Sequence, residues 1–293
     1  MKVSILVPLR AERGPVGDER LRNWAWLEAR WRNHFPEFEI VIGVDDGRAP
    51  FSKTQAVNDA YSRSTGDMLV LADADSWVDA PSLVRGLHYA QTLGVLVVPW
   101  TTAHRLSAAD SARLLASSPT APSPVTKKMV AGAEPYRPSP STVAMIAVLT
   151  RDCFERVGGM DPRFRGWGAE DVAFGLACGT LLGRSHITPG EAYALHHERP
   201  RTNGLRVWED DPGHHNIALA DRYWGAKGKH GAMTALCLEH LLTGSRTPIG
   251  VGPHAHERPV PEYVPEFQEE LQPEVLVREF AGYGVRDGDR IQL

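Results

Sequence analysis

Short apolar runs alternate with helical stretches through the first part of this chain, and each run stops at a turn residue or an acid. The runs are residues 3–7, 39–44 and 68–72. The residues that end them are Pro8, Asp45 and Asp73. Between the first two runs, large apolar side chains recur at helical spacing over residues 20–34. This order predicts an α/β fold with a mainly parallel central sheet and helices on both faces.

The alternation continues for most of the chain. Further strands are expected at residues 95–100, 143–149 and 191–197. Further helices are expected at residues 52–66, with Ser52 as the cap, and at 81–92, 107–115, 152–157, 172–182, 216–224, 233–242 and 275–280. Residues 117–142 are rich in Pro, Ser, Thr and Ala, which predicts a mobile lid or a plain surface loop.

Length, hydrophobic content and net charge are those of an ordinary soluble globular protein. A chain of 293 residues with 42% hydrophobic content can form one large domain or two small ones. We expect one domain over residues 1–200, with residues 201–293 as a helical and Pro-rich extension packed on it. The net charge of -4 gives no general attraction to nucleic acid or to an anionic membrane.

Cysteine usage and apolar run lengths bear on the cellular location. Three widely spaced cysteines argue against a disulfide framework and against a Cys-rich zinc site. The amino-terminal apolar run is too short for a signal peptide, and no run approaches the ~18 residues of a spanning helix. We therefore expect a cytoplasmic protein without a transmembrane segment.

The acids at the end of the third apolar run are candidate metal ligands. Asp73, Ala74 and Asp75 should emerge at the carboxyl edge of the sheet, where open α/β folds bind ligands. Carboxylate oxygens suit Mg²⁺ or Mn²⁺, and a histidine from His196 or His197 at a neighbouring strand end would favour Mn²⁺. A divalent ion here can stabilise a departing diphosphate.

A second acidic motif follows a glycine-rich turn at residues 166–171. Glu170 and Asp171 should lie in the first turn of a helix. Asp171 is the candidate general base that takes the proton of an attacking hydroxyl, and Glu170 would hold acceptor hydroxyls or the donor sugar. Trp167, flanked by Gly166 and Gly168, can stack on a sugar face. The alternative is that both acids only occupy a helix amino terminus, where the helix dipole favours negative charge.

Together these motifs resemble the nucleotide-sugar glycosyltransferases of the GT-A (Rossmann-like) fold, particularly family 2-like enzymes with a galactosyltransferase-type G-W-G-x-E-D motif. The resemblance covers roughly residues 3–200. It implies a metal-dependent transfer of a sugar from a UDP-sugar to an acceptor hydroxyl, with inversion by single displacement. It also implies donor-binding roles for Pro8, Arg10, Asp45, Asp46, Lys53, Asn58, Asp73, Ala74, Trp167 and Gly168.

The resemblance also implies the metal ligands. Asp75 would be the main ligand, assisted by Asp73 and by a strand-end histidine. The alignment favours His196, and a one-residue shift would select His197 instead. Adjacent histidines of a regular strand point to opposite faces, so they cannot both reach one ion.

Other functions remain open at this stage. Some enzymes with similar acidic turns retain the anomeric configuration. A sugar-nucleotide nucleotidyltransferase would also pair such a sheet with acids and a metal, although residues 8–13 lack the glycine-rich loop that holds a triphosphate. A non-catalytic saccharide- or nucleotide-binding module is a third alternative. The acceptor can be a glycan, a protein, a lipid-linked sugar or a hydroxylated nucleobase.

Overall fold

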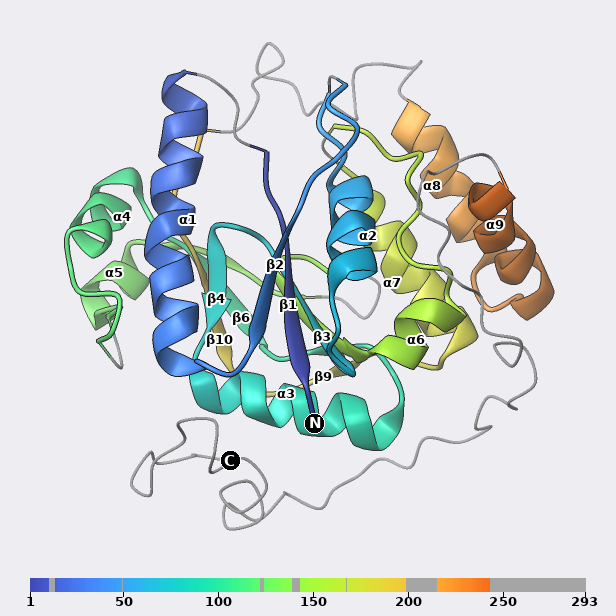
Figure 1. The fold of residues 1–293 in the computed structure, drawn as a ribbon, viewed down its shortest axis with the longest axis horizontal. Coiled ribbons are helices and arrows are strands. Elements are labelled where there is room, and N and C mark those ends of the chain that lie inside the picture. The colour runs from blue at the N-terminus through green and yellow to red at the C-terminus, as the bar shows by residue number, and fades with distance from the viewer. Residues whose placement is uncertain are drawn as a thin grey trace.

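A six-stranded sheet forms the centre of the molecule in the computed structural model (Figure 1). The structure describes residues 1–10, 14–48, 50–121, 124–138, 143–166, 168–198 and 215–242. The strands lie in the order β2 (Glu39–Gly43), β1 (Val3–Pro8), β3 (Met68–Ala72), β8 (Ile146–Thr150), β5 (Val97–Val98) and β9 (His186–Ile187). Only β8 runs against the others in this sheet, which confirms the mainly parallel arrangement.

Helices cover both faces of this sheet, because alternate strand residues point to opposite sides. In β1, Ile5 and Val7 pack into one core with α1 (Pro15–His34) and α3 (Ala80–Leu93). Leu6 points the other way, into a second core with α2 (Lys53–Arg63), α6 (Arg151–Arg156) and α7 (Glu170–Leu181). The predicted fold class, an α/β sheet flanked by helices, is therefore confirmed.

A second, four-stranded sheet stands beside the first. Its order is β4 (Ser76–Val78), β10 (Glu191–Ala194), β6 (Thr102–Arg105) and β7 (Glu134–Tyr136). The sequence did not predict β4, β6, β7 or β9, since runs of two to four residues carry no usable periodicity. The expected strand at 191–197 was too long, because β10 ends at Ala194.

The segment 117–142, which was expected to be a lid or a loop, contains regular structure. After α4 (Ala108–Leu115), the chain forms the short helix α5 (Lys127–Ala131) and then β7. Strand β7 pairs antiparallel with β6, so this part of the segment is tied to the second sheet. Residues 127–131 and 134–136 of the expected lid or loop therefore form a helix and a strand.

Two helices follow the predicted catalytic region. Helices α8 (His215–Ala226) and α9 (His230–Leu242) pack against α7 and against each other (Figure 1). The remainder of the predicted extension, including the helix expected at 275–280, lies outside the described residues. Within the described ranges, no helix combines the length and the apolar character needed to cross a bilayer.

Candidate active site

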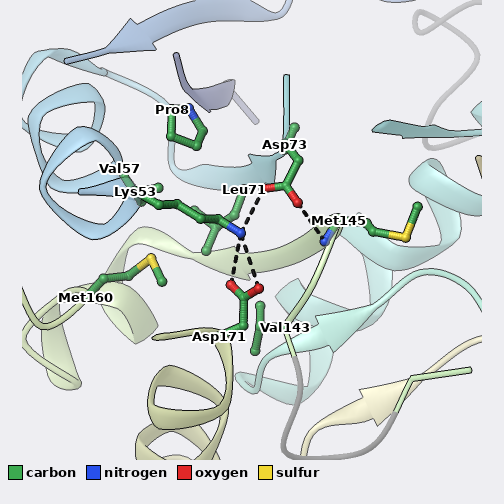
Figure 2. Close-up of a pocket in the computed structure, with 10 residues that line it drawn as sticks. Pro8, Lys53, Val57, Leu71, Asp73, Val143, Met145, Met160 and Asp171 are labelled. Atoms are coloured by element: carbon green, nitrogen blue, oxygen red, sulfur yellow. Dashed lines mark hydrogen bonds and ion pairs between the residues drawn. The ribbon is translucent and has the colours of Figure 1, made fainter. Parts of the chain in front are cut away.

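The site lies at the edge where the parallel strands β1, β2 and β3 end. Pro8 is the last residue of β1, Asp45 follows β2, and Asp73 follows β3. A small cavity opens here, with a volume of about 10 Å³, close to the room that one water molecule needs. Its lining residues are Pro8, Lys53, Val57, Leu71, Ala72, Asp73, Val143, Met145, Met160 and Asp171 (Figure 2).

A single lysine joins the two acidic motifs across this cavity. The Nζ atom of Lys53 lies 2.8 Å from Oδ1 of Asp73 and 2.9 Å from Oδ1 of Asp171 (Figure 2). It also lies 3.3 Å from Oδ2 of Asp171. The side chains of Lys53 and Asp171 are only 19% and 18% exposed, so water screens this contact weakly. The motifs that are separated in sequence therefore meet at one point.

The chain around the cavity holds two unusual backbone conformations. Met145 and Ala169 are the two non-glycine residues with positive φ among those described, at 68° and 70°. The backbone of Met145 forms two hydrogen bonds with Asp73: its N–H donates to the side-chain Oδ2 at 3.2 Å, and its carbonyl accepts from the Asp73 N–H. Ala169 directly precedes α7 and the acids at its start. Such conformations cost of order 1–3 kcal/mol each, and they concentrate at functional sites.

Burial and crowding of like charges change the acid strength of the carboxyls. Burial, opposed by Lys53 and reinforced by the charges of Glu170 and Asp73, raises the pKa of Asp171 to about 7. Burial likewise raises the pKa of Glu170, although the charge of Lys53 opposes it. Burial lowers the pKa of Lys53, but the surrounding acids outweigh it and hold that pKa well above its ordinary value. A carboxyl with a pKa near neutrality is suited to general base catalysis.

Glu170 and Gly168 form a local turn in front of α7. The backbone N–H of Gly168 donates to Glu170 Oε2 at 3.0 Å, and the Gly168 carbonyl accepts from Asn216 Nδ2 at 3.1 Å. Glu170 is 7% exposed, so its carboxylate supports this turn rather than facing solvent. Trp167, predicted to stack on a sugar, lies outside the described residues.

The pairing of β4 with β10 brings Asp75 to a histidine. His197 Nε2 lies 2.9 Å from Asp75 Oδ2. Strand register places Ser76 opposite Ala194, and Leu195 N donates to the Asp75 carbonyl, so His197 continues on the same face as Asp75.

The preferred histidine of the sequence analysis, His196, points elsewhere. Its Nδ1 lies 3.3 Å from Glu19 Oε1, its N–H donates to Ser111, and its carbonyl accepts from Asn23. The structure therefore places His197, the alternative, beside Asp75, and places His196 beside Glu19. The physical reason is the alternation of side chains after β10.

The donor atoms of Asp75 and His197 fit a divalent ion such as Mn²⁺, which accepts oxygen and imidazole ligands. His197 Nδ1 lies 3.0 Å from the Glu198 carbonyl, so Nε2 is the nitrogen that faces Asp75. Burial pushes the pKa of Asp75 upward, but the bonds from His197 and Ser76 outweigh it and keep that pKa low. Within the described residues, no three acidic, histidine or cysteine side chains surround one point. Asp73, expected as a second ligand, instead contacts Lys53 and Met145.

Three of the residues predicted to bind the nucleotide, Arg10, Asp45 and Asp46, form ion pairs with other side chains. Arg10 Nε donates to Asp45 Oδ1 at 3.1 Å, and its guanidinium lies over the Phe51 ring. The Asp45 side chain is 3% exposed and also accepts from Ser52 N, so it holds the turn in place. Asp46 is 34% exposed and forms an ion pair with Arg165.

Two residues with predicted donor-binding roles, Asn58 and Ala74, contact other parts of the protein. Asn58 is 2% exposed; its amide donates to the Met160 carbonyl at 2.6 Å and accepts from Met160 N at 3.0 Å. Asn58 therefore fixes the segment that carries Met160 and does not line the cavity. Ala74 packs partly against the first core.

Sequence reasoning missed Arg165, Met145 and Glu19. Arg165 ties the segment before α7 to the turn after β2, and the N–H of the next residue, Gly166, donates to the Phe51 carbonyl at 2.8 Å. No local pattern marks these residues, because each contacts a partner distant in sequence. Only the position of Arg165 next to the glycine-rich turn offered a signal.

A protein-family model matches part of the chain. Residues 127–177 match a family model described as the N-terminal domain of galactosyltransferase. This segment contains β8 and most of α7, with Glu170 and Asp171. No curated protein matches the chain. The matched segment is therefore galactosyltransferase-like.

Among solved structures, the chain is similar to glycosyltransferases. The catalytic domain of Drosophila β1,4-galactosyltransferase 7 with xylobiose shares 18% identity, with a TM-score of 0.40 over 64% of this chain and 67% of that chain. A variant of the Drosophila enzyme with manganese, UDP-Gal and xylobiose shares 17%, with a TM-score of 0.38 over 64% of each chain. GalNAc-T7 with UDP, GalNAc and Mn²⁺ shares 12%, with a TM-score of 0.45 over 82% of this chain and 55% of that chain.

Proposed function

We propose that this protein is a metal-dependent glycosyltransferase that moves a sugar from a UDP-sugar to an acceptor hydroxyl, with inversion. The observation that carries the proposal is that Asp73 and Asp171, one acid from each motif, both contact Lys53. Asp171 also lies within the galactosyltransferase-like residues 127–177. One motif can face the departing diphosphate, and the other can face the attacking oxygen.

Each side chain has a distinct role in this proposal. Asp171, with a pKa near 7, accepts the proton of the acceptor hydroxyl as that oxygen attacks the anomeric carbon. The bond from the anomeric carbon to the diphosphate oxygen breaks in the same step. Lys53 supplies positive charge at the cavity, and Arg10 supplies it beside the turn after β2, on the donor side.

Asp75 and His197 would hold the metal ion, which when bound would neutralise charge on the diphosphate oxygens. His197 is oriented for this role through its Nδ1 contact with the Glu198 carbonyl. An outer contact of this kind fixes the tautomer of a ligating imidazole.

A panel of nucleotide sugars, assayed for nucleotide diphosphate release with and without Mn²⁺, tests the proposal. We expect release that requires Mn²⁺ and that Asp75→Asn abolishes. Asp152→Asn is the matched control, because Asp152 is a 62% exposed acid on α6 away from the cavity. Equal release by the wild type and Asp75→Asn would contradict the metal assignment.

The same assay separates the alternative functions. Pyrophosphate release from a nucleoside triphosphate and a sugar phosphate would identify a nucleotidyltransferase. Nucleotide binding without turnover on any acceptor would identify a binding module. NMR analysis of the product anomer decides between inversion, which we propose, and retention.

A further inference from the structure

We propose that Lys53 is an exchangeable counter-ion, which binds Asp171 or the donor diphosphate but not both, so that donor binding releases the base. The inference deepens the proposed function and rests on it. It assigns to Lys53 a positioning role in addition to donor contact.

The carboxylate of Asp171 contacts Lys53 through both of its oxygens. Both of its carboxylate oxygens lie within 3.3 Å of Lys53 Nζ, at 2.9 and 3.3 Å. A carboxylate held by an ammonium group on both oxygens is a weaker base than one that is not, because proton uptake would break the ion pair. Asp73 differs, since one of its oxygens has the Met145 N–H as a further partner. Asp171 therefore gains basicity when Lys53 leaves.

The cavity beside Lys53 is too small for a donor molecule. A volume of about 10 Å³ cannot admit a sugar diphosphate while the lysine side chain crosses it. Figure 2 shows the side chain of Lys53 extending from its helix to Asp73 and Asp171, which line the cavity together with it. Admission of the donor at this point requires the ammonium group to move.

The lysine can move while its backbone stays in place. Ser52 caps α2, its N–H donates to Asp45 at 3.0 Å, and its hydroxyl donates to the Phe164 carbonyl at 2.8 Å. The start of the helix is thus fixed, whereas the four-carbon stem of Lys53 is flexible. A diphosphate beside this helix start would meet both the ammonium charge and the positive end of the helix dipole.

This arrangement makes a specific thermodynamic prediction. If Asp171 and the diphosphate compete for Lys53, removal of the Asp171 charge must tighten nucleotide binding, because linkage between two sites is reciprocal. Loss of a nearby negative charge also favours anion binding by itself, so the gain supports competition only if it depends on Lys53.

The experiment is a double-mutant cycle of UDP affinity, measured by calorimetry at saturating Mn²⁺. The proteins are the wild type, Asp171→Asn, Lys53→Met and the double variant. We expect Asp171→Asn to tighten UDP binding roughly fivefold, the lower range of measured couplings. Lys53→Met should weaken binding, and Asp171→Asn should then add nothing.

Three outcomes would overturn the inference. Unchanged or weaker UDP binding by folded Asp171→Asn would show that Lys53 stays with Asp171. An equal gain in both backgrounds would show that the gain does not act through Lys53. No UDP binding by the wild type would refute the proposed function, and this inference with it. If Lys53→Met does not fold, as judged by circular dichroism and thermal melting, Lys53→Gln provides the second background.

Discussion

The Nζ atom of Lys53 lies 2.9 Å from Oδ1 of Asp171, although 118 positions of sequence separate the two residues. The contact brings the first turn of α2 to the first turn of α7. It depends on both helices lying on the same face of the central sheet, against the second core.

Asp171→Asn should lower turnover by ~10²-fold or more, the usual scale for removing a general base. Asparagine keeps the size of the side chain but cannot take up the proton of the acceptor. Steady-state kinetics with the best donor of the panel would measure the effect. Asp152→Asn, on α6, is a control that makes the same acid-to-amide change at a 62% exposed residue away from the cavity. Near-normal turnover of Asp171→Asn would show that another group is the base.

The pH dependence of kcat/KM should follow the ionisation of Asp171. Because only the deprotonated carboxylate can accept a proton, the rate should be lost below a pKa of about 7 and reach a plateau above it. The acidic limb should therefore have its midpoint near pH 7, above the ordinary range for an aspartate. A midpoint near pH 4 would contradict the role of burial at this residue.

The two adjacent histidines should differ in their effect on metal affinity. His197→Ala removes the imidazole that lies 2.9 Å from Asp75 and should weaken Mn²⁺ binding by about tenfold or more. His196→Ala leaves that pair intact and should have an effect several times smaller. Calorimetric titration of Mn²⁺ in the presence of UDP would measure both. The reverse order would restore His196 as the ligand.

Glu19 should support the metal site without contacting the metal. Its carboxylate lies 3.3 Å from His196 Nδ1 and accepts from Glu198 N at 3.1 Å, so it holds both neighbours of His197. Glu19→Ala should weaken Mn²⁺ binding several-fold, while kcat at saturating Mn²⁺ stays near normal. Glu28→Ala on the same helix is the control. Equal Mn²⁺ affinities would remove Glu19 from this role.

Gly43 should be essential for the position of α2. A Cβ atom at Gly43 would lie 1.8 Å from the Ala56 carbonyl oxygen, so Gly43→Ala must push the helix away from β2. Overpacking of this kind costs roughly 1–3 kcal/mol or more of unfolding free energy. Gly179→Ala is the matched control: nothing lies within 4 Å of its Cβ position in α7. Chemical denaturation should show a loss only for Gly43→Ala.

Much of the architecture could be predicted because its causes are local. The buried runs that became β1, β2 and β3 stand out by length and apolar content, and Ser52 does cap α2 as predicted. Strands of two to four residues, such as β4 and β9, escaped prediction since they are stabilised by pairing with distant partners. Helix α5 and strand β7 were not predicted because the Pro-rich composition of residues 117–142 indicated a loop.

The candidate site shows the same division. Asp73, Asp75 and Asp171 were identified from their positions at a strand end and a helix start, and the structure brings Asp73 and Asp171 to one ammonium group. The choice between His196 and His197 depended on the register of β10 against β4. The burial of Asn58 against Met160 could not be predicted either, because Met160 lies on a distant loop.

The sequence by itself determined the α/β class, the order of the main strands and helices, and the residue types that could perform metal and base chemistry. These follow from periodicity and from local preferences, which act over a few residues. Only the tertiary structure decided which side chains face one another: Lys53 beside Asp171, His197 beside Asp75, and Arg165 against Asp46. Such contacts arise from strand register and helix packing across more than a hundred positions, which no local pattern encodes.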